Sequence, residues 1–399
     1  MSDPLSSTGS STPQITLWTY PWDILDEGPA TAVARMKATG ADAVSVAVVY
    51  HTMEQVRPHL GGTTLDHPDT VACFAPNDAR YRDTPLRPPF VPRQDVADPL
   101  GAIAEACTEA GLTLHAWTIC CHVVTLGRAY PDLCQVNALG DRLLATLCPS
   151  QPAVQAYLIG LVSDVVSRYP IRRFELESLQ YHNRWSEALQ EKNALPFGPV
   201  EGYLRGLCVC SACCRRAEPL GVDTSRVAAL AREHLHRFAQ SGEPSHQTLA
   251  EFVTGDTDLL SYHRMRQETL RALIRACHEA AAPAGTCVFF FGNEYGAGLR
   301  IGQIVDDVTI TGDLFYSAEL ETNMALLDRR LKEDRIDPAR LLASISGFGA
   351  QSPDAPALSR TMVTMAKRGV GYFGVYNYGI MRLEQLDWVR QAIEAAKAL

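Results

Sequence analysis

The sequence predicts an α/β protein built as one (β/α)8 TIM barrel. Eight apolar, strand-like runs alternate with helix-period segments along most of the 399 residues, which is the pattern of a closed parallel barrel. The first predicted strand ends in Thr19-Tyr20-Pro21-Trp22, without the Gly-rich turn that follows strand one in many open, doubly wound sheets. Two long connections, 52–98 and 179–224, follow predicted strands two and four, on the face where barrel active sites lie. The barrel is therefore favoured over an open sheet.

Local signals place the individual elements. Gly40 and Gly111 each follow a helix-period run, and Pro152 suits a first helical turn. The strands are predicted at 15–22, 43–50, 112–120, 171–178, 286–291, 304–311, 341–346 and 371–378. The helices are predicted at 29–39, 99–110, 151–169, 256–282, 320–332, 357–368 and 384–398. We expect residues 1–13 to form a disordered leader and 14–399 a single barrel domain, with 52–98 and 179–224 as insertions at the catalytic face.

Composition limits the classes of function. The chain is 46% hydrophobic and 20% charged, which is ordinary for a globular protein with a large core. A net charge of -9 argues against nucleic-acid binding. No apolar run reaches the roughly 20 residues that span a bilayer, and the first residues lack a signal-peptide pattern. We expect a cytoplasmic protein without membrane or nucleic-acid partners, acting on a small molecule; the sequence leaves a homo-oligomer open.

Two glutamates on predicted strand four are the strongest candidates for chemistry. Glu175 and Glu177 alternate with Phe174 and Leu176, so both carboxylates should face the barrel lumen while the apolar side chains face the helices. Glu177 lies nearer the carboxyl end of the strand, where barrel enzymes place catalytic groups. We predict Glu177 as the principal catalytic carboxylate. Glu175 is predicted either to bind substrate or to pair, deep in the lumen, with an arginine from a neighbouring strand.

A glycosidase needs a second carboxyl group, because one group protonates the leaving oxygen while the other attacks or activates water. Glu294 follows predicted strand five, Asp313 follows predicted strand six, and Asp23 follows strand one. An ordinary turn or cap role is the alternative for each. Glu294 is preferred, and Asp313 is kept as a second candidate.

Aromatic and imidazole side chains gather near the predicted strand ends. Flat aromatic faces and polar tips suit the binding of sugars, although some of these side chains are expected only to pack the barrel. The candidates for substrate binding, besides Glu175, are Tyr20, His51, His122, Tyr181, His182, Tyr316 and Tyr378.

A cysteine cluster follows predicted strand four. Cys208, Cys210 and Cys213 offer three thiolates within six residues, a spacing typical of structural zinc sites. The fourth ligand is left open between Cys134, Cys148 and Cys214. Since a closed thiolate site has no position for substrate, we predict a structural zinc ion that pins the loop; a set of free thiols is the alternative.

Part of the chain resembles a known group of proteins. The segments Asn137–Asp141 and Leu147–Pro152, followed by a long helix and a strand ending in Glu-Leu-Glu-Ser, resemble glycoside-hydrolase-like TIM barrels of an uncharacterised bacterial group. The cysteine cluster is similar to that of zinc-containing barrel β-galactosidases, and this resemblance implies Cys134, or less directly Cys148, as the fourth ligand. The resemblance to these barrel proteins covers residues 112–215. The rest of the chain resembles them only in its pattern of alternating strands and helices.

The sequence departs from those β-galactosidases at the catalytic positions. They carry an acid/base after an asparagine on strand four and a nucleophile on strand seven, whereas here Leu176 precedes Glu177 and predicted strand seven has no acid. Other barrel glycosidases combine a nucleophile on strand four with an acid on strand five or six, which would suit Glu177 with Glu294 or Asp313.

The leading hypothesis is a glycoside-hydrolase-like enzyme that acts on a small intracellular sugar conjugate through a carboxylate pair. The alternatives are a barrel lyase or isomerase of a polar metabolite and a non-catalytic sugar-binding barrel. The sugar, the aglycone and the stereochemical outcome are not encoded in any pattern that the sequence shows.

Overall fold

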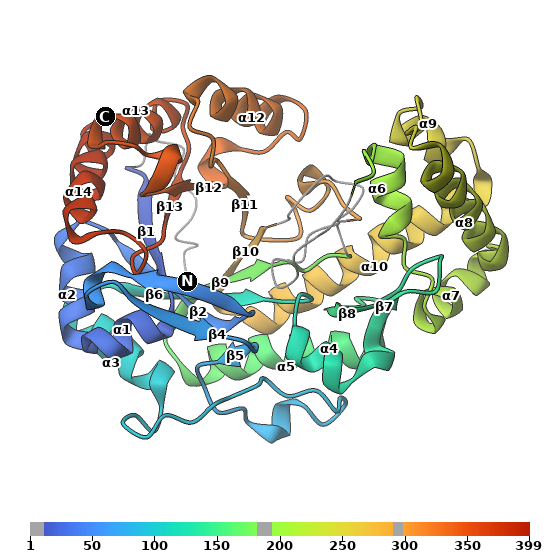
Figure 1. The fold of residues 1–399 in the computed structure, drawn as a ribbon. Coiled ribbons are helices and arrows are strands. Elements are labelled where there is room, and N and C mark those ends of the chain that lie inside the picture. The colour runs from blue at the N-terminus through green and yellow to red at the C-terminus, as the bar shows by residue number, and fades with distance from the viewer. Residues whose placement is uncertain (1–11, 182–193, 290–297) are drawn as a thin grey trace.

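The protein is a closed parallel barrel of eight strands, as predicted. The computed structural model describes residues 12–181, 194–289 and 298–399. The barrel strands are β1 (Gln14–Thr19), β2 (Ala43–Tyr50), β6 (Thr113–Ile119), β9 (Ile171–Glu177), β10 (Gly285–Phe289), β11 (Ile310–Leu314), β12 (Leu341–Ser346) and β13 (Tyr372–Tyr376). Each pairs in parallel with its neighbours, and the β1–β2 and β1–β13 pairings close the barrel (Figure 1).

The prediction for strand six is wrong in position. The sequence favours a strand at 304–311, but β11 begins at Ile310. Ile310 and Leu314 pack against lumen side chains, and Phe289 occupies the space beside Gly312, where an added Cβ would lie 2.1 Å from the ring. Because side chains alternate along a strand, Asp313 must point outward, toward the helices.

Helices surround the barrel and alternate with its strands. They are α1 (Pro21–Glu27), α2 (Pro29–Ala38), α3 (Pro99–Ala110), α4 (Val124–Ala129), α5 (Pro152–Arg168), α10 (Thr257–Ala281), α12 (Leu320–Lys332), α13 (Ala355–Ala366) and α14 (Leu383–Lys397). Pro at the first turn and Gly111 in the left-handed region bound α3 as predicted. No helix among the described residues is long and apolar enough to cross a membrane.

The two long connections contain secondary structure of their own. The first holds a hairpin of β3 (Met53–Arg57) and β4 (Thr63–His67), and β5 (Val71–Ala72), which pairs antiparallel with β2. The connection after β9 leads into α6 (Pro199–Arg205), α7 (Ser211–Ala217), α8 (Thr224–Ser241) and α9 (Leu249–Thr254). These helices gather on one side of the barrel and are reached by the long α10 (Figure 1). A second hairpin joins β7 (Cys134–Val136) to β8 (Arg142–Leu147).

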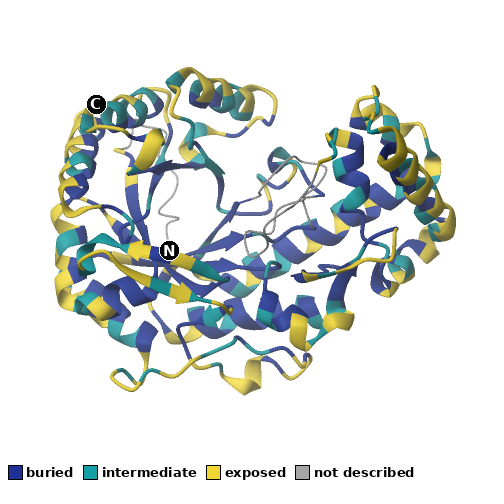
Figure 2. Cartoon of the chain, viewed as in Figure 1, coloured by how far each residue is buried: buried dark blue, intermediate teal, exposed yellow. Residues whose placement is uncertain are grey.

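Side chains fill the barrel lumen. Arg173 of β9 donates a hydrogen bond of 3.0 Å to Thr16 of β1, and Ser45 of β2 donates one of 2.8 Å to Glu175 of β9. These strands are not neighbours, so both contacts cross the lumen. Nearer the carboxyl ends of the strands, Trp18 and Trp117 stack with ring centroids 5.4 Å apart. The strands are almost wholly buried, whereas the β3–β4 hairpin is largely exposed (Figure 2).

Candidate active site at the mouth of the barrel

Glu177 is the last residue of β9 and lies at the carboxyl end of the barrel. Its neighbours in register are Ile119 of β6 and Phe289 of β10. The residue is 9% exposed, and Trp117 donates its indole N–H to the Glu177 carboxylate. Phe174 and Leu176 belong to the core formed with the helices, so the predicted alternation of faces along this strand is confirmed.

Glu175 lies one step deeper in the lumen and is fully buried. Arg173 approaches its Oε1 at 2.9 Å through Nε and at 2.8 Å through Nη2, and Ser45 donates to its Oε2. His115 lies 3.9 Å away, and burial together with the Arg173 charge lowers its pKa, so this imidazole is neutral. Direct contact of Glu175 with substrate does not fit this arrangement. The predicted pairing with an arginine is present, but Arg173 belongs to the same strand and not to a neighbouring one.

Three tyrosines form a hydroxyl chain beside Glu177. The Tyr20 hydroxyl donates to that of Tyr50 at 3.2 Å and lies 2.5 Å from that of Tyr376. Burial raises the pKa of Tyr50 well above its usual range, and the nearby Tyr20, Tyr376 and Glu177 raise it further. Burial raises the pKa of Tyr20 in the same way, so Tyr20 and Tyr50 are neutral hydrogen-bonding groups. Tyr376 is half-buried, so part of its ring borders the open mouth.

A cavity of about 490 Å³ opens next to these tyrosines, a size suited to a small ligand. Its lining combines the tyrosine chain with the β3–β4 hairpin, and consists of Tyr20, Tyr50, His51, Thr52, Met53, Glu54, Gln55, Val56, Pro58, Tyr376 and Ile380. The long connection after β2 thus supplies one wall of the mouth.

Two of the predicted histidines meet at this mouth. His51 follows β2 and His122 follows β6, and their rings make an edge-to-face contact with centroids 5.3 Å apart. His51 stacks on Tyr50, and its Nδ1 lies 2.7 Å from the carbonyl oxygen of Thr52. Tyr316 also borders this region, because its ring lies 6.1 Å from that of Tyr376 and its hydroxyl lies 2.8 Å from that of Ser344.

Gln55 is a site residue that the sequence analysis missed. It is buried on β3, accepts a hydrogen bond of 2.7 Å from the Trp22 indole, and donates to both carboxylate oxygens of Asp23 at 3.0 and 3.2 Å. Asp23 is packed closely enough that a Cβ on Gly379 would lie 1.8 Å from its Oδ2. Asp23 and Trp22 therefore fix the orientation of the Gln55 amide in the cavity wall. The only sequence signal was the position of Asp23 after strand one.

Asp23 should make stability depend on pH. Burial raises its pKa from 3.8 to about 7, against the opposing hydrogen bond from Gln55. The folded protein then holds a proton that the unfolded chain releases between these pH values, so this group lowers stability as pH rises. The neutral variant Asp23→Asn lacks this dependence on pH. Its free energy of unfolding, measured relative to that of wild type, should therefore rise by about 4 kcal/mol from pH 4 to pH 8.

Denaturant unfolding across this pH range measures that difference. Asp83→Asn, at an exposed position, controls for the substitution itself. A difference for Asp23→Asn that stays constant with pH would show that Asp23 keeps its charge in the folded protein.

Three predicted site residues lie away from the mouth. Asp313 forms an ion pair with Arg330 of α12, on the outer side of the barrel, so it does not face Glu177. The fully buried Tyr378 donates to Glu27 of α1. Tyr181 is also fully buried, with its hydroxyl 2.7 Å from that of Ser150. Glu294 and His182 lie outside the described residues.

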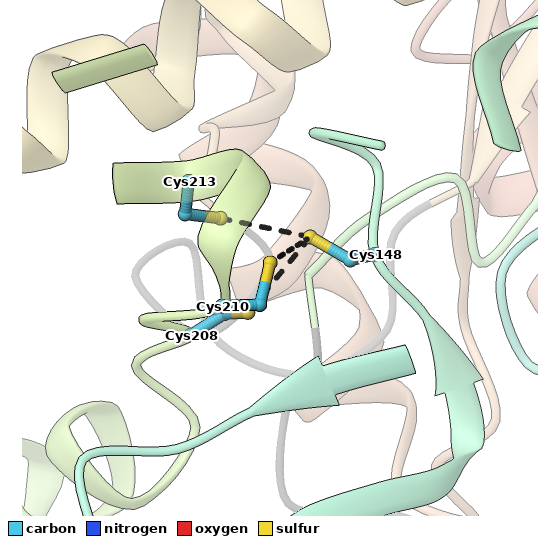
Figure 3. A group of neighbouring side chains, drawn as sticks. All are labelled: Cys148, Cys208, Cys210 and Cys213. Carbon is cyan, nitrogen blue, oxygen red and sulfur yellow. Dashed lines mark hydrogen bonds between the residues drawn. The ribbon is translucent and has the colours of Figure 1, made fainter. Parts of the chain in front are cut away.

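Four buried cysteines converge beside the barrel. The Cys148 sulfur lies 3.6 Å from those of Cys210 and Cys213 and 3.8 Å from that of Cys208, and all four sulfurs lie within 4.8 Å of one another (Figure 3). Cys148 is therefore the fourth member of the cluster. The resemblance implied Cys134 in this position, and the structure corrects that expectation. The Cys134 sulfur points instead to the carbonyl oxygens of Gly127 and Tyr130, at 3.5 and 4.0 Å.

The arrangement fits a tetrahedral metal ion. Zn–S bonds of about 2.3 Å place tetrahedral sulfurs roughly 3.8 Å apart, close to the three separations above, and none of these cysteines forms a disulfide. The backbone N–H of Val136 donates to the Cys208 sulfur at 3.4 Å, as to a thiolate. Hydrogen bonds within the cluster lower the pKa of Cys210, whereas burial raises the pKa values of Cys148 and Cys208. The four sulfurs can therefore bind one metal ion of a kind that prefers thiolate ligands.

No protein-family model and no curated protein matches the sequence. Solved structures do match the fold. The PgaB (BpsB) glycoside hydrolase domain from Bordetella bronchiseptica is 13% identical, with a TM-score of 0.55, over 92% of this chain and 94% of that one. The β-galactosidase from Bacillus circulans sp. alkalophilus is 12% identical, with a TM-score of 0.56, over 97% of this chain and 56% of that one.

A third similar structure is the alpha-L-fucosidase isoenzyme 2 from Paenibacillus thiaminolyticus. It is 12% identical, with a TM-score of 0.55, over 96% of this chain and 49% of that one. The chain thus spans about half the length of the fucosidase and the galactosidase. The resemblance to glycoside-hydrolase barrels is confirmed at the level of the fold.

Proposed function

We propose that the protein is a glycosidase-like barrel enzyme that cleaves or remodels a glycosidic bond in a small sugar conjugate, with Glu177 as its principal carboxylate. The observation that carries the proposal is the position of Glu177 at the carboxyl end of a barrel strand, near Tyr50, which lines the aromatic cavity. Barrel enzymes build their active sites at this end. The structural similarity to glycoside hydrolases supports the same class of reaction.

The groups around Glu177 suit a sugar. The Trp117 N–H orients the carboxylate, and the ring of Tyr376 offers a face for the C–H surface of a pyranose. The hydroxyls of Tyr20 and Tyr50 and the amide of Gln55 are neutral groups that can bond sugar hydroxyls. The net charge of the cavity lining is low, with Glu54 as its one carboxylate among the described residues.

Glu294 is our proposed partner for Glu177. It follows β10 in the chain, and the last residue of that strand, Phe289, is paired with Glu177. This part of the proposal rests on chain position. Asp313 is no longer a candidate, because Arg330 holds it on the outer face of the barrel.

A lyase or isomerase is the second candidate. The His51–His122 pair lies at the same mouth, and a histidine with a carboxylate can act as an acid/base pair on a polar metabolite. The products separate the two reactions, since a hydrolase adds water and a lyase leaves an unsaturated product.

A panel of aryl glycosides, short oligosaccharides and uronic-acid conjugates tests the proposal, with products identified by mass spectrometry. A product mass increased by water supports glycoside hydrolysis. An unsaturated product would contradict glycoside hydrolysis and support the lyase reaction. Saturable binding of a sugar, without turnover of any compound in the panel, would indicate a non-catalytic sugar-binding barrel.

We also propose that Cys148, Cys208, Cys210 and Cys213 bind a structural zinc ion. The ion would hold the β8 end, which carries Cys148, against α7, which carries Cys213. With four thiolates it would have no open position for substrate. Its role would be to anchor the long connection that follows the strand bearing Glu177.

Removing one sulfur tests this assignment. After exhaustive dialysis, wild type and Cys134→Ser should each retain about one zinc per chain, and Cys148→Ser on the order of a tenth of that. Elemental analysis of protein purified without added metal measures the content. Equal zinc content in the two variants would contradict the ligand set, and a metal-free wild type would contradict the zinc itself.

A further inference from the structure

Arg266 is a buried cation that pairs with no carboxylate among residues 12–181, 194–289 and 298–399. It lies on α10 and is 1% exposed. Within the described parts of the chain, its Nε and Nη1 atoms have no hydrogen-bond partner, and no carboxylate forms an ion pair with it. A buried charge is costly unless an opposite charge or good hydrogen bonds compensate it. The position therefore calls for a source of negative charge nearby.

Aromatic rings meet only part of this requirement. The guanidinium carbon lies 4.2 Å from the ring centroid of Tyr181 and 5.6 Å from that of Tyr203. Cation–π contacts of this kind are favourable when desolvated, but they offset only part of what burying an ion costs.

The same side chains connect Arg266 to the four cysteines. The Tyr181 hydroxyl lies 2.7 Å from the Ser150 hydroxyl, which lies 3.2 Å from the Cys213 sulfur. Tyr262, one turn before Arg266 on α10, donates its hydroxyl to the Cys208 carbonyl oxygen at 2.5 Å. The guanidinium and the cysteine cluster thus belong to one packed, polar unit.

We propose that Arg266 is the counter-charge of the metal centre formed by Cys148, Cys208, Cys210 and Cys213. Four thiolates around a divalent ion carry a net charge of two negative units, and Arg266 is the buried cation that lies across Tyr181 and Ser150 from them. The inference rests on the metal assignment above. It adds that Arg266 determines how tightly a divalent ion binds, although it is not a ligand.

Metal competition against a chromophoric chelator tests this role with zinc, and the cobalt(II) thiolate absorption band gives a second readout. Arg266→Met should bind zinc about 10- to 100-fold more weakly than wild type, the range typical of groups outside the ligand set that tune a metal. Arg266→Lys, which keeps the charge, should recover most of this loss. Arg264→Met, the same substitution at an exposed position of α10, should bind zinc as wild type does.

Thermal unfolding with and without chelator separates this role from simple packing. We expect Arg266→Met to lower the melting temperature of the zinc-loaded protein and to leave the chelated protein at least as stable as chelated wild type, since an uncompensated buried charge has been removed. Equal losses with and without chelator, or unchanged zinc affinity, would overturn the proposal. A wild type that binds no zinc would instead overturn the metal assignment itself.

Discussion

Glu177→Gln is expected to lower kcat/KM on the responsive glycoside by about 10³-fold, within the range that positioned acid–base groups contribute. Glutamine keeps an oxygen that can accept the hydrogen bond from the Trp117 indole, so the local packing should persist. It can neither transfer a proton nor form a glycosyl ester. Initial rates with the substrate found in the glycoside panel measure the loss, and binding of the same sugar by calorimetry shows whether the site is retained.

The matched control is Glu105→Gln, the same chemical change at an exposed position of α3. It should leave both turnover and melting temperature unchanged. If Glu177→Gln retained most of the wild-type kcat/KM while folding normally, Glu177 would not be the catalytic carboxylate. A loss of activity accompanied by a large drop in melting temperature would point to a structural role instead.

The barrel could be predicted from the sequence because its signal repeats. Each strand is a short apolar run, and each run is followed by helix-period sequence, so an error at one element does not change the eightfold pattern. The placement of β11 shows the limit of this approach. Val305 and Val308 resemble strand residues, yet the strand begins at Ile310. Asp313 therefore lies within the strand and not after its end.

The site could be predicted only where a local rule determines a side chain's direction. Alternation along β9 placed Glu175 and Glu177 in the lumen correctly. The partners of those side chains come from distant segments, so the sequence contained no comparable signal for them. Gln55 reaches Asp23 because a hairpin from the first long connection folds over α1, and no pattern in 52–98 specifies that docking.

The fourth cysteine illustrates the same limit. Cys208, Cys210 and Cys213 are close in sequence, so their spacing alone indicates a cluster. Cys134 and Cys148 are two ends of one hairpin, whose strands run antiparallel, and both lie near the cluster in the chain. Which of them turns its sulfur toward the other three depends on the side of the hairpin that faces α7, and this is a property of tertiary packing.

The largest effect on stability is expected from Glu175→Gln, which should lower the free energy of unfolding by about 3–5 kcal/mol. The substitution leaves Arg173, 5% exposed, without the carboxylate that its Nε and Nη2 both contact. Burial keeps His115 neutral, and the remaining acceptor on Arg173 among the described residues is the Thr16 hydroxyl. Denaturant unfolding at neutral pH measures the loss.

The double variant Arg173→Met/Glu175→Leu shows whether charge is the cause. Replacing both members of a buried ion pair by apolar side chains of similar volume is often nearly neutral, whereas removing one leaves a charge uncompensated. The double variant should therefore be more stable than Glu175→Gln, although it changes more atoms. If it is less stable, the hydrogen bonds from Ser45 and to Thr16, which the double variant also loses, contribute more to the lumen than the ion pair does.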